Sequence, residues 1–184
     1  MKLLKILKHF FKEYQLPILS GVLIGTSYIP FPPWASLFGL VPLWLFWLQN
    51  PTRKKIIISG WISQFILTAI GFSWIAYNIH EFGAMPWAVS ILGMIIFCSF
   101  ANYYIPFAGW VWFELTRKNK KYIFSSILLL GLLTALFETY FQTIFKWNFA
   151  YTWMWSRIPL YQWSEFIGFQ GLSSFIILCN AFLL

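Results

Sequence analysis

The residue best placed to do chemistry is Glu138, which lies about two-thirds of the way along the apolar run 122–145. An ionisable group at membrane depth is costly to bury, so it is a candidate functional residue. It belongs to a stripe of small and polar residues with helical spacing, formed by Gly131, Thr134, Glu138 and Gln142. Two interpretations stay open: a functional carboxyl group, or a structural hydrogen bond between helices, with Asn102 as a possible partner.

The remaining reactive side chains form no catalytic constellation. His80 and Glu81 adjoin the run 56–77, where such a pair is more typical of an interfacial cap than of a catalytic site. Cys98 and Cys179 lie in separate apolar runs, with no CxxC and no Cys/His cluster, so we expect small buried hydrophobes and no metal site. The sequence has no Ser/His/Asp arrangement, phosphate-binding glycine loop or carboxylate pair. We therefore assign it no catalytic residue, metal ligand or cofactor.

Composition indicates what must position Glu138. Of 184 residues, 60% are hydrophobic and only 10% are charged, whereas a soluble domain has about 25% charged residues. Disorder is excluded because it requires low hydrophobicity and high charge. The sequence therefore predicts an all-α, polytopic membrane helix bundle of about six spans, with no room for a separate soluble domain.

The pattern along the chain predicts an amphipathic basic interfacial helix over residues 1–15 and a transmembrane bundle over 16–184. The six expected spans are 16–29, 34–48, 56–77, 87–113, 122–145 and 163–184. The first two are short, so they form either two tilted spans or a re-entrant hairpin. Pro106 should kink the fourth.

The net charge of +8 comes from 13 basic and 5 acidic residues. Eleven of the basic residues fall in three groups between apolar runs, at 2–12, 53–55 and 117–121. That placement favours orientation in a membrane over nucleic-acid binding. We expect both termini and the basic loops to be cytoplasmic, loops 78–86 and 146–162 to be extracytoplasmic, and residues 2–14 to lie on the anionic inner leaflet.

An ordered set of motifs resembles the N-terminal membrane domain of bacterial apolipoprotein N-acyltransferases. The most specific piece is Gly71-Phe72-Ser73-Trp74-Ile75 followed by Phe82-Gly83-Ala84-Met85-Pro86, similar to the family's FGGMP loop. The other pieces are residues 19–25, Tyr28-Ile29-Pro30-Phe31, Val41-Pro42-Leu43, Glu138, Trp147-Asn148 with Tyr151, residues 159–162, residues 167–173, and Asn180. The chain departs from the family at Ala84, at Phe141-Gln142-Thr143, where the family has Arg-Gly-Trp, and at Ile144-Phe145-Lys146, where it has Gly-Phe-Pro.

This resemblance implies a multi-pass protein of the bacterial cytoplasmic (inner) membrane. The family transfers an acyl chain from a phospholipid to the amino group of a diacylglyceryl-cysteine, through a Glu-Lys-Cys triad in a nitrilase-like domain beyond a seventh span. None of that triad can be assigned here. We therefore expect a lipid-facing platform, half of an enzyme and inactive alone. Its expected partners are membrane phospholipid, diacylglyceryl apolipoprotein and a separate nitrilase-like catalytic chain.

The resemblance also suggests where substrates would be met. The candidate substrate-facing and lipid-facing residues are Trp74, Asn78, His80, Glu81, Phe82, Met85, Pro86, Glu138, Gln142, Trp147, Asn148 and Tyr151. Two alternatives remain from the residues alone: a six-span substrate-binding subunit of a membrane transporter, and an inactive remnant.

Overall fold

A computed structural model describes residues 2–50, 52–118, 123–141 and 148–184, with the side chains described from residue 8 onward. Within these residues every regular element is helical, which confirms the all-α fold class. The elements are α1 (Lys2–Glu13), α2 (Gln15–Gly25), α3 (Val41–Gln49), α4 (Arg53–Gly71), α5 (Trp74–Glu81), α6 (Trp87–Phe100), α7 (Tyr104–Thr116), α8 (Ile123–Tyr140), α9 (Ala150–Trp155), the 3-10 helix η1 (Pro159–Trp163) and α10 (Ser164–Phe182).

The bundle is a chain of neighbouring helices: α2 packs on α4, α4 on α7, α7 on α8, and α8 on α10. Glycines allow the close approaches. A Cβ at Gly21 would lie 2.7 Å from the carbonyl oxygen of Ser63, and one at Gly60 would lie 2.8 Å from Cα of Pro106. Small residues serve this purpose where helices meet in membranes, because lipid offers no hydrophobic drive for helix association.

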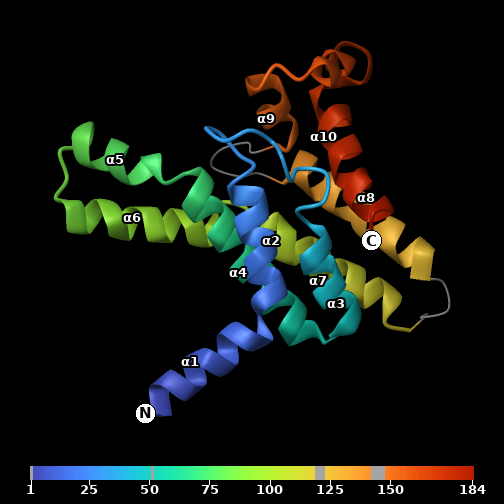
Figure 1. The fold of residues 1–184 in the computed structure, drawn as a ribbon, viewed down its shortest axis with the longest axis horizontal. Coiled ribbons are helices and arrows are strands. Elements are labelled where there is room, and N and C mark those ends of the chain that lie inside the picture. Colours follow the sequence, from blue (N-terminus) through green and yellow to red (C-terminus); the bar gives the residue numbers. More distant parts are fainter. Residues whose placement is uncertain (1, 51, 119–122, 142–147) are drawn as a thin grey trace.

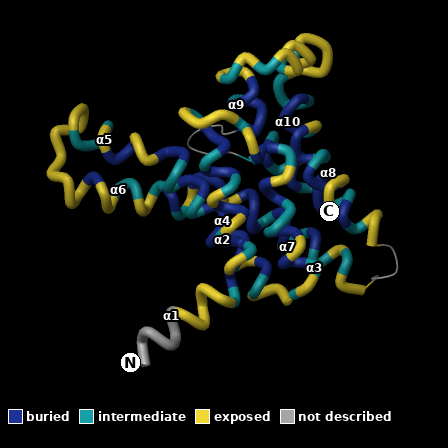
Figure 2. Tube along the Cα trace, viewed as in Figure 1, coloured by how far each residue is buried: buried dark blue, intermediate teal, exposed yellow. Residues whose placement is uncertain are grey.

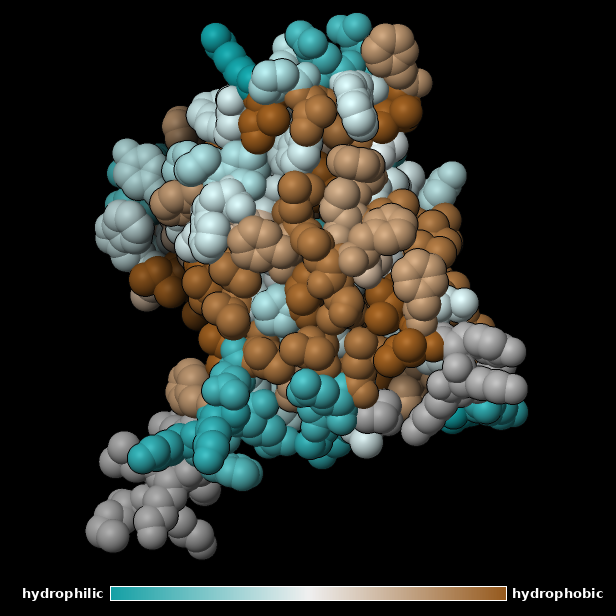
Figure 3. Space-filling model, turned by 45° about the vertical axis from the view of Figure 1, so that its right-hand side comes forward, coloured by the Kyte–Doolittle hydropathy of each residue, from teal (hydrophilic) through white to brown (hydrophobic). Residues whose placement is uncertain are grey.

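Two parts project from the bundle. The hairpin of α5 and α6, referred to below as the arm, extends sideways, and α1 extends from the end opposite α9 (Figure 1). Most of the arm is exposed, while the buried residues gather where α2, α4, α7, α8 and α10 meet (Figure 2). One face of the molecule shows a broad apolar belt with hydrophilic residues above and below it (Figure 3).

The expected spans and the observed helices differ. Among the described residues, three helical stretches are long and apolar enough to cross a membrane: Trp87–Thr116, Ile123–Tyr140 and Pro159–Phe182. A fourth is obtained if α4 and α5, which are bent by 57° at their junction, form one broken span. The two short expected spans contain only α2 and α3, of 11 and 9 residues, joined by a loop over residues 26–40.

A break between α6 and α7 at residues 101–103 lies where the kink in the fourth run is expected, although α6 and α7 together still form one apolar stretch, Trp87–Thr116. The break precedes Pro106, because a proline removes one helical N–H and its ring clashes with the carbonyl four residues earlier. Gln64 of α4 fills the gap: its Nε2 donates to the carbonyl oxygens of Cys98 (3.1 Å) and Ser99 (3.0 Å), and its Oε1 accepts from the backbone N–H of Asn102 (3.2 Å). Side chains of α4 thus replace the hydrogen bonds that the break removes.

Candidate functional site

Glu138 lies at the centre of a buried hydrogen-bond network that joins α8, α9 and α10. Its side chain is 7% exposed. Oε1 accepts from the backbone N–H of Phe149 (3.0 Å), just before α9, and Oε2 accepts from the hydroxyl of Ser173 (2.6 Å) on α10. One carboxylate therefore fixes three segments that are separated in the sequence.

The network extends beyond the carboxylate. Asn148 Nδ2 donates to Gln170 Oε1 (2.7 Å) on α10, and the ring of Tyr151 packs on that of Phe169 with centroids 4.6 Å apart. The structural interpretation of Glu138 is thus supported, but Asn102 is the wrong partner. Its Nδ2 donates to Thr68 Oγ1 (2.9 Å) instead, because the break between α6 and α7 brings it against α4.

A second polar cluster holds the loop 26–40 against the same end of the bundle. The indole N–H of Trp153 on α9 donates to Ser36 Oγ (2.8 Å). Asn180 on α10 accepts from the backbone N–H of Leu40 (2.9 Å) and donates to the carbonyl oxygen of Ser36 (2.9 Å). On α2, the hydroxyl of Ser20 donates to the carbonyl oxygen of Gly39 (2.6 Å). This irregular loop is therefore fixed to three helices.

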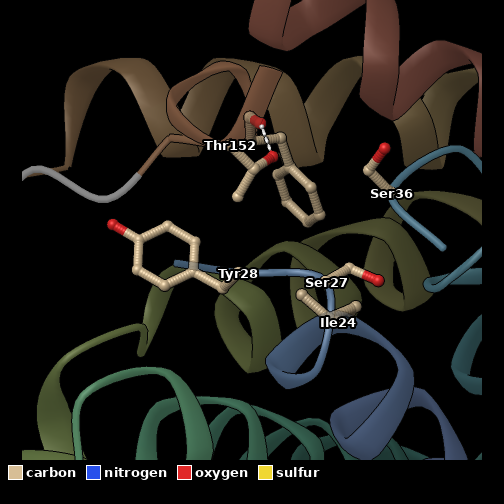
Figure 4. A pocket seen from close by; sticks show the side chains of 6 residues that line it. Ile24, Ser27, Tyr28, Ser36 and Thr152 are labelled. Atoms are coloured by element: carbon tan, nitrogen blue, oxygen red, sulfur yellow. Dashed lines mark hydrogen bonds between the residues drawn. The ribbon is translucent and has the colours of Figure 1, made fainter. Parts of the chain in front are cut away.

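A small pocket separates the loop from α9. It has a volume of about 10 Å³ and is lined by Ile24, Ser27, Tyr28, Ser36, Phe149 and Thr152. Thr152 faces Tyr28, Ser27 and Ile24 across it, with Ser36 at its side (Figure 4). The pocket has room for about one water molecule, not for a lipid chain.

The arm carries the other candidate residues. At its tip, His80 Nδ1 lies 2.7 Å from the carbonyl oxygen of Met85, and the His80 ring stacks on Trp87 with centroids 4.1 Å apart. These contacts close the turn between α5 and α6, which supports the cap interpretation of His80. Phe82, in this turn, is 85% exposed. Ala84 adopts a positive φ of 49°, a left-handed conformation that favours glycine.

The structure separates the candidate residues into two groups. Trp74, Asn78, His80, Glu81, Phe82, Met85 and Pro86 belong to the arm, away from α8 and α9 (Figure 1). Glu138, Asn148 and Tyr151 belong to the network. Gln142 and Trp147 lie outside the described residues. Among the described residues, no group of three or more His, Cys, Asp or Glu side chains could hold a metal ion.

Sequence reasoning did not assign a site role to Ser173, Gln170, Phe149, Ser36 or Asn180. Two signals were available. Residues 167–173 and Asn180 belong to the motifs that resemble the family, and Gln170 and Ser173 are three residues apart, so they share a face of α10 and can meet the same neighbour. No comparable signal marks Phe149, which contributes only its backbone N–H.

Comparison with known proteins gives a consistent result. Residues 20–182 match the family model described as "Apolipoprotein N-acyltransferase N-terminal domain". A Bdellovibrio bacteriovorus protein named apolipoprotein N-acyltransferase is 45% identical over 179 residues, which are 96% of this chain and 32% of that protein. Proteins of the same name from Pseudomonas aeruginosa and Geobacter metallireducens are each 27% identical, over 93% and 94% of this chain and 34% and 33% of their own lengths. The chain spans about a third of the length of these relatives.

Proposed function

This chain belongs to the apolipoprotein N-acyltransferase N-terminal domain family, and on that premise we propose that it is the membrane platform for acyl transfer from a phospholipid to an apolipoprotein. The observation that carries the proposal is the division of the molecule into two parts. One end is fixed by buried hydrogen bonds around Glu138 and Asn180. The arm, which projects away from that end, exposes large apolar side chains along most of its length.

The two parts have different roles in this proposal. The arm contacts lipid through exposed side chains that include Trp74, Phe82 and Met85, because apolar surface of this extent needs an apolar partner. The Glu138 network has a positioning role: it holds the segment from Asn148 to Trp155 against α8 and α10, where a catalytic domain would meet the bundle. The acyl-transfer chemistry itself belongs to a nitrilase-like domain, on the same polypeptide or on a separate chain.

The orientation in the membrane is part of the proposal. We place the protein in the bacterial inner membrane with its N-terminus, the 53–55 turn and the 117–121 loop in the cytoplasm. The tip of the arm and the segment around α9 then face outward. Six crossings follow if α2 and α3 each cross as short spans, and four if they enter and return on the same side. In either case α1 lies along the cytoplasmic face as an amphipathic helix. The basic residues of α1, the 53–55 turn and the 117–121 loop support that orientation, because cytoplasmic segments next to membrane spans are rich in Lys and Arg.

The experiment is reconstitution of apolipoprotein N-acylation. The chain is expressed with a nitrilase-like catalytic chain or domain from the same genome, in cells depleted of their own N-acyltransferase, and the mass of a diacylglyceryl apolipoprotein is measured. We expect acylation and co-purification when both parts are present, and neither from this chain alone. Glu138→Ala should reduce acylation while Glu165→Ala, at an exposed glutamate of α10, should not. If the two parts together neither acylate the apolipoprotein nor associate, the proposal is wrong.

A further inference from the structure

The helix α1 and the start of α4 lie at the opposite end of the molecule from the Glu138 network (Figure 1) and carry a group of exposed basic residues. Lys8, Lys12 and Lys54 are exposed there, and none of the three forms an ion pair with a described residue. The nearby carboxylates are already engaged: Glu13 with Lys55 (3.1 Å), and Glu114 with Arg53 (2.6 Å) and Arg117 (3.2 Å). The lysines are therefore left without protein counter-charges.

The other side of α1 is aromatic and leads into the bundle. The ring of Phe10 lies 4.9 Å from that of Tyr14, which lies 5.6 Å from that of Phe46 on α3. Tyr14 is buried, whereas the neighbouring Phe11 is 59% exposed. At about 100° per residue, Phe10, Phe11 and Tyr14 share an arc of about 100°, and Lys8 and Lys12 lie together on the other side.

We propose that α1 is a docking element for anionic phospholipids of the leaflet at this end of the bundle. Lys8 and Lys12 lie against the lipid phosphates, and Phe11 enters the boundary between headgroups and acyl chains. The Glu13–Lys55 ion pair and the Phe10–Tyr14–Phe46 contacts hold α1 against the bundle at the depth of this headgroup boundary. An exposed aromatic side chain beside the lysines favours a lipid surface over a soluble polyanion, because an amphipathic helix gains from apolar burial and from charge at the same boundary.

The test places a reporter at Phe11. The full chain, with Phe11→Cys and alanine in place of both native cysteines, carries an environment-sensitive fluorophore and is reconstituted into nanodiscs of phosphatidylcholine with or without phosphatidylglycerol. The emission should shift to the blue only in anionic discs, and 1 M salt should reverse the shift. Lys8→Gln and Lys12→Gln should each lower the ratio of docked to undocked helix about fivefold. The matched control Lys118→Gln, at an exposed lysine after α7, should leave it unchanged.

Three results would overturn the proposal: equal emission in neutral and anionic discs, an equal effect of Lys118→Gln, or the same blue shift in neutral discs on adding a short RNA. The inference rests on the proposed orientation in the membrane and not on acyl transfer. Because the assay contains no apolipoprotein and no catalytic partner, its failure and the failure of the acylation experiment are separate outcomes.

Discussion

Replacing Glu138 with alanine removes the acceptor for at least two buried donors, the backbone N–H of Phe149 and the hydroxyl of Ser173. A buried donor left without an acceptor costs about 1–3 kcal/mol, and side-chain hydrogen bonds between membrane helices average about 0.6 kcal/mol, with a maximum of about 1.7. We therefore expect Glu138→Ala to lower the free energy of unfolding by about 2–4 kcal/mol. Ser173→Ala should cost only about 1 kcal/mol, because the carboxylate keeps its bond to Phe149.

Glu138→Gln separates the charge of this side chain from its role as an acceptor. The amide oxygen can still accept from Phe149, and the hydroxyl of Ser173 can rotate to accept from the amide nitrogen. We expect a loss of about 1 kcal/mol or less. The measurement is reversible unfolding in mixed micelles by titration with a denaturing detergent, followed by tryptophan fluorescence. Glu165→Ala is the matched control, because this glutamate is exposed on α10.

A double-mutant cycle between Glu138→Ala and Ser173→Ala completes the measurement. The two losses should be non-additive by about 1 kcal/mol, because each substitution removes the same hydrogen bond. The reasoning is refuted if the free energy of unfolding of the Glu138→Ala variant lies within about 0.5 kcal/mol of that of the unmodified chain, because ordinary surface substitutions change stability by that much. It is also refuted if Glu138→Gln lowers the free energy of unfolding as much as Glu138→Ala does. That result would assign the loss of stability to the missing charge and not to the missing acceptor.

The same titration tests the remaining predictions. Ala84→Gly should stabilise the chain by about 1 kcal/mol by relieving a positive φ of 49°, whereas Gly83→Ala should destabilise it, because a Cβ there would lie 2.5 Å from the carbonyl oxygen of Ile79. Gly168→Ala should lower the free energy of unfolding by about 1–3 kcal/mol, because φ 73° and ψ 165° within α10 form a backbone conformation that suits glycine almost alone. A steric clash would not be the cause, because no atom lies within 4 Å of the added Cβ. Gln64→Leu should cost about 2 kcal/mol, because the carbonyl oxygen of Cys98 and the backbone N–H of Asn102 lose their Gln64 partner, while the carbonyl oxygen of Ser99 keeps the indole N–H of Trp61. Gln162→Leu, at an exposed position of η1, is its control.

The position of Glu138 could be predicted from the sequence, but its partners could not. Helical spacing places Gly131, Thr134 and Glu138 on one face, and all three are buried on α8. Periodicity describes one helix at a time, however. The carboxylate is met by a backbone N–H from beyond the end of that helix and by a hydroxyl 35 residues away, and which of several polar side chains reaches it depends on how the helices pack.

The loop 26–40 shows the same limit. Most of this loop falls inside the expected spans 16–29 and 34–48, and the sequence assigns no role to its serines. Their role becomes visible only with the fold, because Asn180 meets the loop from a position 140 residues beyond Leu40. The break before Pro106 was easier to foresee, because a proline acts on its own helix whatever surrounds it.

The polar contacts are distributed unevenly between the bundle and the arm, and this bears on the proposed division of roles. The end of the bundle near α9 has hydrogen bonds from α2, α8 and α10 in addition to its apolar contacts. Along the arm beyond the Gln64 contacts, the polar side-chain bonds described are local ones, such as that between His80 and Met85. Few buried contacts and exposed apolar side chains are features of regions that open or shift at low cost. In the proposed division of roles, an arm of this kind would adapt to lipids of different shape, while the Glu138 network keeps the segment around α9 in place.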